Sequence, residues 1–96
     1  MQIEYHPAVR QDVGEAALRY NAVSRKLAVE FKEELHRIIS KAAENPNRFP
    51  AVRPRFHRAN LRRFPYHVIY REIPAGIRVT LVRHHRRHPD VGIERD

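Results

Sequence analysis

Two strand-like segments joined by a short turn constrain this chain more than any other feature of its sequence. The segment Tyr66–Ile73 reads YHVIYREI and is rich in aromatic and β-branched residues, which favour strands. Pro74-Ala75-Gly76 follows and is typical of a turn, because proline fixes φ and glycine accepts positive φ. Residues 77–82, IRVTLV, then alternate apolar and polar side chains with the period of a strand. The pattern predicts a β-hairpin.

A run of cations and imidazoles follows the second strand of this hairpin. The chain has 19 Lys and Arg against 11 Asp and Glu, and most of the excess lies in residues 48–88, where 11 arginines accompany a single acid, Glu72. Arginine makes planar, bidentate contacts with phosphate and carboxylate groups. The charge therefore predicts an anionic partner, which is RNA, DNA or an acidic protein segment. The alternative is a basic face that only keeps the protein soluble.

Two helices are predicted before the hairpin. Pro7 has a favourable place at the first position of a helix, whose apolar stripe runs from Val9 to Tyr20. Asn21 is predicted to break this helix and to cap a second one, which has the stronger apolar periodicity and ends near Ala43. We expect the two helices to form an antiparallel hairpin whose apolar stripes pack on the sheet.

The remaining segments complete a β-α-α-β-β-β order. Gln2–Tyr5 is predicted to be a short strand, residues 47–54 an ordered loop around Phe49, and residues 55–63 another strand. Residues 91–96 are expected to fray. The prediction is a single α+β domain over residues 1–96, with a helical hairpin packed on a mostly antiparallel sheet. Without cysteines, a leader-like segment or an apolar run long enough for a bilayer, a cytoplasmic protein with no membrane partner is expected.

Several segments resemble the RelE/ParE superfamily of toxins from type II toxin–antitoxin systems, often called plasmid stabilisation proteins. The matching segments are HPAVRQDV, LAVEFKEEL, AENPNRFP, LRRFPYHVIYRE and IRVTLVRHHRRHP, with FPY-x-V-x-Y-R and V-x-H-x-R-R-x-P as the specific parts. The resemblance spans nearly the whole chain and implies a RelE/ParE-like fold. It also implies a growth-inhibiting toxin that is neutralised by a cognate antitoxin with an acidic, partly disordered segment.

The superfamily divides by target, and the resemblance bears on that division. RelE-like members are ribosome-dependent mRNA endonucleases, whereas ParE-like members act on DNA gyrase without known nuclease chemistry. RelE-like enzymes tend to have a basic residue after the strand tyrosine, where this chain has His67, and an aromatic residue near the position of Val91. The H-x-R-R-x-P ending is more similar to ParE-like and unassigned branches. ParE-like gyrase poisoning or an unassigned target is therefore favoured, with ribosome-dependent mRNA cleavage as the alternative.

Cleavage of RNA through the 2′-hydroxyl requires a base, an acid and cations, and the chain offers candidates for each role. His67, His84 and His85 are candidates for acid and base because imidazole titrates near neutrality. The arginines that are candidates for holding nucleic acid or another target are Arg62, Arg63, Arg71, Arg83, Arg86 and Arg87. No metal and no other cofactor is expected, since arginines beside His84, His85 and His88 would repel a cation.

Alternation along the first hairpin strand predicts which side chains face outward. Tyr66, Val68 and Tyr70 are expected under the helices, which leaves His67 and Arg71 on the opposite face and accessible to a ligand. An exposed strand face without catalysis has the same appearance. A third hypothesis is therefore a non-toxic module that binds nucleic acid through its basic face alone.

Overall fold

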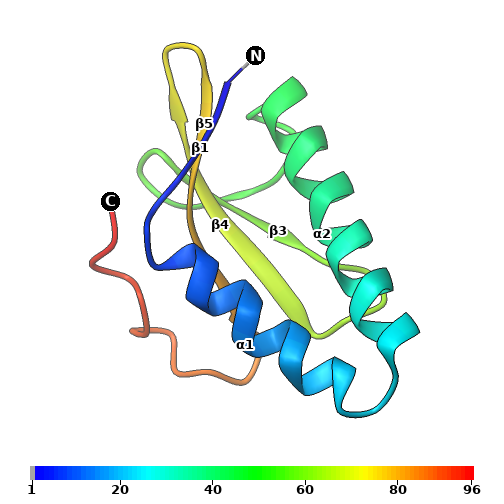
Figure 1. Cartoon of the computed structure of the whole chain (residues 1–96). Helices are drawn as coiled ribbons and strands as arrows, with labels where there is room; N and C mark the ends of the chain where they lie inside the picture. Colours follow the sequence, from blue (N-terminus) through cyan, green and yellow to red (C-terminus); the bar gives the residue numbers. More distant parts are fainter. Residues whose placement is uncertain (1) are drawn as a thin grey trace.

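A five-stranded sheet with two helices on one face makes up residues 2–96, the part of the chain that the computed structural model describes (Figure 1). The strand order is β1-β5-β4-β3-β2, with β1 parallel to β5 and every other pair antiparallel. The predicted α+β class, mostly antiparallel sheet and β-α-α-β-β-β order are confirmed, with one short strand, β2, added after the helices. The elements are β1 Gln2–Tyr5, α1 Val9–Asn21, α2 Arg25–Glu44, β2 Ala51–Arg53, β3 Phe56–Asn60, β4 Tyr66–Ile73 and β5 Gly76–His84.

The helix starts differ from the sequence prediction because individual local hydrogen bonds decide them. Helix α1 begins at Val9, after a turn in which the backbone N–H of Ala8 donates to Nδ1 of His6 at 3.0 Å. Asn21 ends α1, and the cap of α2 is instead Ser24, whose Oγ accepts the backbone N–H of Leu27 at 3.0 Å. Such a cap stabilises a helix by about 1 kcal/mol.

The main core lies between the helices and one face of the sheet. Tyr66, Val68 and Tyr70 are buried there, which confirms the predicted helix-facing side of β4. The Phe31 ring of α2 contacts the Tyr66 ring with 5.2 Å between centroids. Each buried aromatic or branched side chain stabilises the fold by about 1.5–3 kcal/mol relative to exposure. The apolar stripes of both helices pack into this core.

The segment expected to be a loop around Phe49 contains a short edge strand. Residues Ala51–Arg53 form β2, which pairs with β3, so the sheet has one strand more than was predicted. Pro50 and Pro54 flank this strand. Because proline provides no backbone donor, it is tolerated at strand ends and edges, and these two residues keep β2 short.

The turn between β4 and β5 is made by Pro74 and Ala75, and Gly76 is already the first residue of β5. Gly76 is needed for a different reason from the positive φ expected of it. A Cβ at this position would lie 1.9 Å from the carbonyl oxygen of Gln2. The close approach of β1 to β5 therefore requires glycine here.

An irregularity in β5 changes which side chains reach each face of the sheet. Ile69 of β4 pairs with Leu81 and Tyr70 pairs with Val79, so Thr80 is an extra residue in β5. Val79 packs in the main core, whereas Leu81 joins a second cluster on the opposite face. This β-bulge reverses the simple alternation predicted for residues 77–82. Beyond it, odd-numbered residues face away from the helices.

The C-terminal residues are packed on the domain, so the expectation of fraying was wrong. Arg95 pairs with Asp12 of α1 through both guanidinium nitrogens, one of them at 3.2 Å, and also donates to the carbonyl of Thr80. Gly92 has φ of 77°, a conformation that glycine accepts readily, and this turn directs the chain back toward β5. The segment runs past α1 in orange to red (Figure 1).

Candidate functional site

His67 lies at the start of β4 on the face opposite the helices, but it is sealed in the structure. Its exposed fraction is 1%. The expectation that its imidazole is open to a ligand was therefore wrong, although the predicted strand face is correct. The ring is covered because His85 stacks on it with 5.2 Å between centroids, and because Arg83 reaches across from the neighbouring strand.

The hydrogen bonds around His67 define its protonation state. Nε of Arg83 donates to Nε2 of His67 at 3.0 Å, so Nε2 is an acceptor and the proton of the neutral ring is on Nδ1. Nδ1 of His67 then donates to Nδ1 of His85 at 2.9 Å. Burial, followed by the charges of Arg58 and Arg83, lowers the pKa of His67 to about 3. The ring is neutral at pH 7, with both nitrogens engaged.

Arg83 is held on the same outer face. Its Nη1 donates to the carbonyl oxygens of Pro89 at 2.8 Å and Val91 at 3.1 Å, in addition to the Nε bond to His67. Burial and then the charge of Arg58 lower the pKa of Arg83. The guanidinium of Arg83 uses these donors inside the protein, so few of its N–H groups remain for a paired contact with a phosphate group.

His85 and His84 point to different sides of the sheet end. Burial and the charges of Arg58 and His84 lower the pKa of His85, whose Nδ1 lies 3.4 Å from Nη2 of Arg58. His84 is on the helix side, edge-on to Tyr66 with 5.0 Å between ring centroids. Burial, Arg19 and Arg86 lower the pKa of His84. The structure thus brings His67 and His85 together and separates His84 from them.

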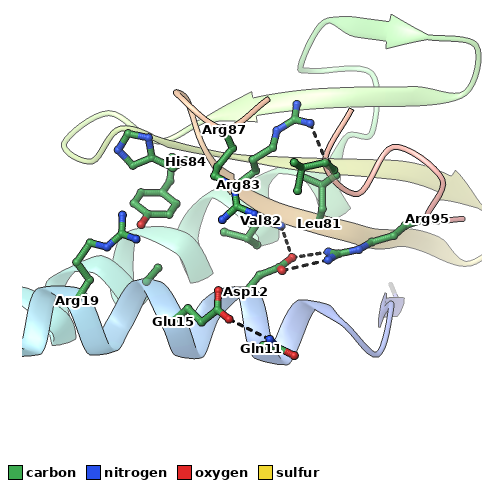
Figure 2. Close-up of a pocket in the computed structure, with 13 residues that line it drawn as sticks. Gln11, Asp12, Glu15, Arg19, Leu81, Val82, Arg83, His84, Arg87 and Arg95 are labelled. Carbon is green, nitrogen blue, oxygen red and sulfur yellow. Dashed lines mark hydrogen bonds and ion pairs between the residues drawn. The ribbon is translucent and has the colours of Figure 1, made fainter. Parts of the chain in front are cut away.

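A cavity of about 200 Å³ lies between α1 and the end of β5, on the helix side (Figure 2). Arg19 of α1 and His84 of β5 are at one end, and the Asp12–Arg95 pair is at the other. Asp12 also accepts the backbone N–H of Val82 at 3.1 Å, just after the bulge. The remaining lining residues are Gln11, Glu15, Ala16, Tyr66, Leu81, Val82, Arg83, Arg87 and Val91.

The other arginines predicted as target-binding residues are spread over three places. Arg62 and Arg63 are exposed in the connection between β3 and β4, where their backbone N–H groups donate to the buried carboxylate of Glu34. Arg71 is on the outer face further along β4 and pairs with Asp96 at 3.4 Å. Arg86 and Arg87 are exposed in the turn after β5, and only Arg87 lines the cavity.

The prediction from the sequence did not include four residues of this region. Arg58 was detectable in principle, because alternation along β3 places it on the outer face with His67. Arg19 is one of two exposed cations on α1, and the sequence does not set it apart from Arg10. Asp12 and Arg95 are 83 positions apart in the chain, and no periodicity links them. Only the folded chain joins them.

Neither a metal centre nor a membrane helix is present in the described part of the chain. Residues 2–96 contain no group of three or more His, Asp or Glu side chains placed to hold a metal ion. None of the helices within that range combines the length and apolar character required to cross a bilayer.

Comparison with known proteins bears on the family and the fold. A family model described as the ParE toxin of the type II toxin–antitoxin system parDE matches residues 3–89. A solved structure described as the chromosomal ParDE toxin–antitoxin system from P. aeruginosa superposes with a TM-score of 0.75 at 14% sequence identity. The alignment covers 88% of this chain and 95% of that chain, which shows a shared fold. No curated protein matches the sequence.

Proposed function

The chain belongs to the ParE toxin family of type II toxin–antitoxin systems, and from this premise we propose that it inhibits growth by binding its target without cutting RNA. DNA gyrase is the proposed target, as expected for a ParE-like toxin, and the basic end of the sheet is the proposed contact surface. A cognate antitoxin with an acidic segment is the proposed partner, because the exposed arginines at this end suit carboxylates.

The sealed His67 is the observation that supports binding over cleavage. A general base must accept a proton from the substrate and must therefore lie within hydrogen-bond reach of it. His67 is 1% exposed, and both of its ring nitrogens are bonded inside the protein. His84 and His85 are on opposite sides of the sheet end, so they do not form an acid–base pair around one phosphate. The geometry favours a surface that docks over one that catalyses.

Expression of the chain alone, and together with the product of a small acidic neighbouring gene, tests this proposal. We expect growth arrest from the chain alone and rescue by the neighbour. Gyrase poisoning predicts a DNA-damage response and inhibited supercoiling by purified gyrase, with transcript ends unchanged. Codon-positioned mRNA cuts would instead support a RelE-like endonuclease and overturn the proposal. If expression leaves growth unaffected, the non-toxic nucleic-acid-binding module is the better reading.

A further inference from the structure

The cavity between α1 and the end of β5 has hydrogen-bond donors that the protein itself does not use. Within residues 2–96, the guanidinium groups of Arg19 and Arg87 have no hydrogen-bond or ion-pair partner, and neither does the hydroxyl of Tyr66. By contrast, the guanidiniums of Arg53, Arg78, Arg83 and Arg95 all donate to carbonyl or carboxylate oxygens. Other exposed arginines, such as Arg10 and Arg25, are also unpaired, but Arg19 and Arg87 are the two unpaired guanidiniums that line this cavity within residues 2–96.

His84 adds a further donor to the same wall. Its Nδ1 accepts the backbone N–H of Arg86 at 3.0 Å, so the proton of the neutral ring is on Nε2. Burial lowers the pKa of His84, and the charges of Arg19 and Arg86 lower it further because they make the local potential positive. Figure 2 shows Arg19 rising from α1 at the end of the cavity where His84 lies. The wall thus combines two guanidiniums, an imidazole N–H and a phenol.

We propose that this cavity binds the phosphate group of a phosphate ester. Donors arrive from α1, β4 and β5, and such a distribution suits a tetrahedral oxyanion with oxygens on several sides better than a planar carboxylate with two. The volume of about 200 Å³ accommodates a phosphate group with part of its ester. The proposal goes beyond the toxin function, since it is stated for the purified protein and holds whichever target the toxin has.

The cavity also contains an internal competitor for the cations. Glu15 is one helical turn before Arg19 on α1, and its carboxylate accepts a hydrogen bond from the side-chain amide of Gln11 at 2.9 Å. Its charge opposes the entry of a phosphate and attracts the same guanidinium. Asp12, the other carboxylate of the cavity, is already neutralised by Arg95. Removing the charge of Glu15 should therefore tighten phosphate binding, whereas removing Arg19 should weaken it.

NMR titration of the His84 ring with inorganic phosphate tests the proposal directly. Bound phosphate should raise the pKa of His84 by about one unit, because the anion favours the imidazolium. Arg19→Gln and Arg87→Gln should each weaken phosphate binding about tenfold, and Glu15→Gln should strengthen it about threefold. Arg25→Gln, an exposed arginine at the start of α2 outside the cavity, is the matched control and should change nothing.

Two further ligands distinguish the sources of the phosphate. A mononucleotide 5′-phosphate that binds as well as a short single-stranded DNA oligonucleotide would identify a free phosphate ester as the ligand. If the oligonucleotide binds more tightly than the mononucleotide, and Arg19→Gln still weakens its binding, the ligand is a nucleic-acid backbone. The proposal is overturned if Arg19→Gln and Arg25→Gln bind phosphate equally well, or if an acidic peptide binds the cavity and phosphate does not. Growth arrest is measured separately, so failure here leaves the toxin assignment standing.

Discussion

Arg83 and Arg87 lie close together in the sequence, yet they are in opposite situations. Arg83 is on the outer face of the sheet, where it donates to His67 and to the carbonyl oxygens of Pro89 and Val91. Arg87 lines the cavity on the helix side and has no partner within residues 2–96. His67 and His84 repeat the contrast, with one imidazole sealed and the other beside the cavity. The residue type alone therefore does not decide what each side chain can do. Its burial and its hydrogen-bond partners decide this.

The largest expected effect comes from Leu81→Ala, which truncates the apolar side chain that the bulge places on the outer face of the sheet. Leu81 is buried there with Phe56 and Ile69 in the second apolar cluster. We expect the free energy of unfolding to fall by about 3–4 kcal/mol, measured by urea denaturation. Thr80→Val keeps the bulge and loses only the Oγ1 bond to the carbonyl of Ile69, for about 1 kcal/mol. Equal stability of both variants would contradict the placement of Leu81 in a packed cluster on the outer face.

Asp12→Ala should have the next largest effect. It leaves the guanidinium of Arg95 and the backbone N–H of Val82 without their acceptor in a partly buried position. We expect a loss of about 2–3 kcal/mol in the free energy of unfolding. Glu15→Ala is the matched control, an exposed carboxylate of the same helix and cavity, and should change stability by less than about 0.5 kcal/mol. If the two variants unfold alike, Asp12 does not clamp the C-terminal segment.

Acidification should destabilise the sealed region through His67. The folded-state pKa is about 3 against 6.5 for the free side chain, so the unfolded chain binds the proton first as pH falls. The contribution of neutral His67 to the free energy of unfolding is fully present above pH 6.5. It is lost as pH falls toward 3, with about 2 kcal/mol lost between pH 7 and pH 5. Denaturation at both pH values should show a smaller loss for His67→Gln than for the original chain. His36→Gln, an exposed site on α2, should retain the full pH dependence.

The smallest effect concerns the two arginines themselves. Arg83→Gln should lower the free energy of unfolding by about 1–2 kcal/mol, because three acceptors lose their charged donor. Arg87→Gln should change it by less than about 0.5 kcal/mol, since its side chain is exposed. Thermal or urea unfolding of the pair measures the difference. Similar losses from both would show that the sealed and open regions are energetically alike.

Much of the fold was predictable because the strongest signals are local. The apolar stripe of α2 and the aromatic, β-branched run of β4 follow the periods of a helix and a strand, and both elements are where these periods placed them. The start of α1, the cap at Ser24 and the strand β2 were predicted wrongly. These features depend on individual hydrogen bonds and on pairing with a neighbour, to which periodicity is insensitive.

The candidate site was predictable in location and less so in chemistry. The sequence indicated that basic and imidazole side chains gather at the end of the hairpin, and the structure has them there. It did not indicate that His67 is buried, since a covering residue such as His85 comes from another strand end. It also did not reveal the cavity, whose walls come from the first and last parts of the chain.

By itself, the sequence determined the elements of this protein, the composition of its basic end and its family, because each of these depends on residues near one another in the chain or on their kinds. The tertiary structure alone decided which cations are sealed and which are open. The extra residue Thr80 changes which side chains of β5 lie on each face of the sheet. The pair of Asp12 and Arg95, distant in the sequence, fixes the C-terminal segment beside this bulge. Strand alternation has a period of two, and at the bulge two residues of β5 oppose one of β4, so Leu81 and the later residues lie on the face opposite to the one that simple alternation assigns.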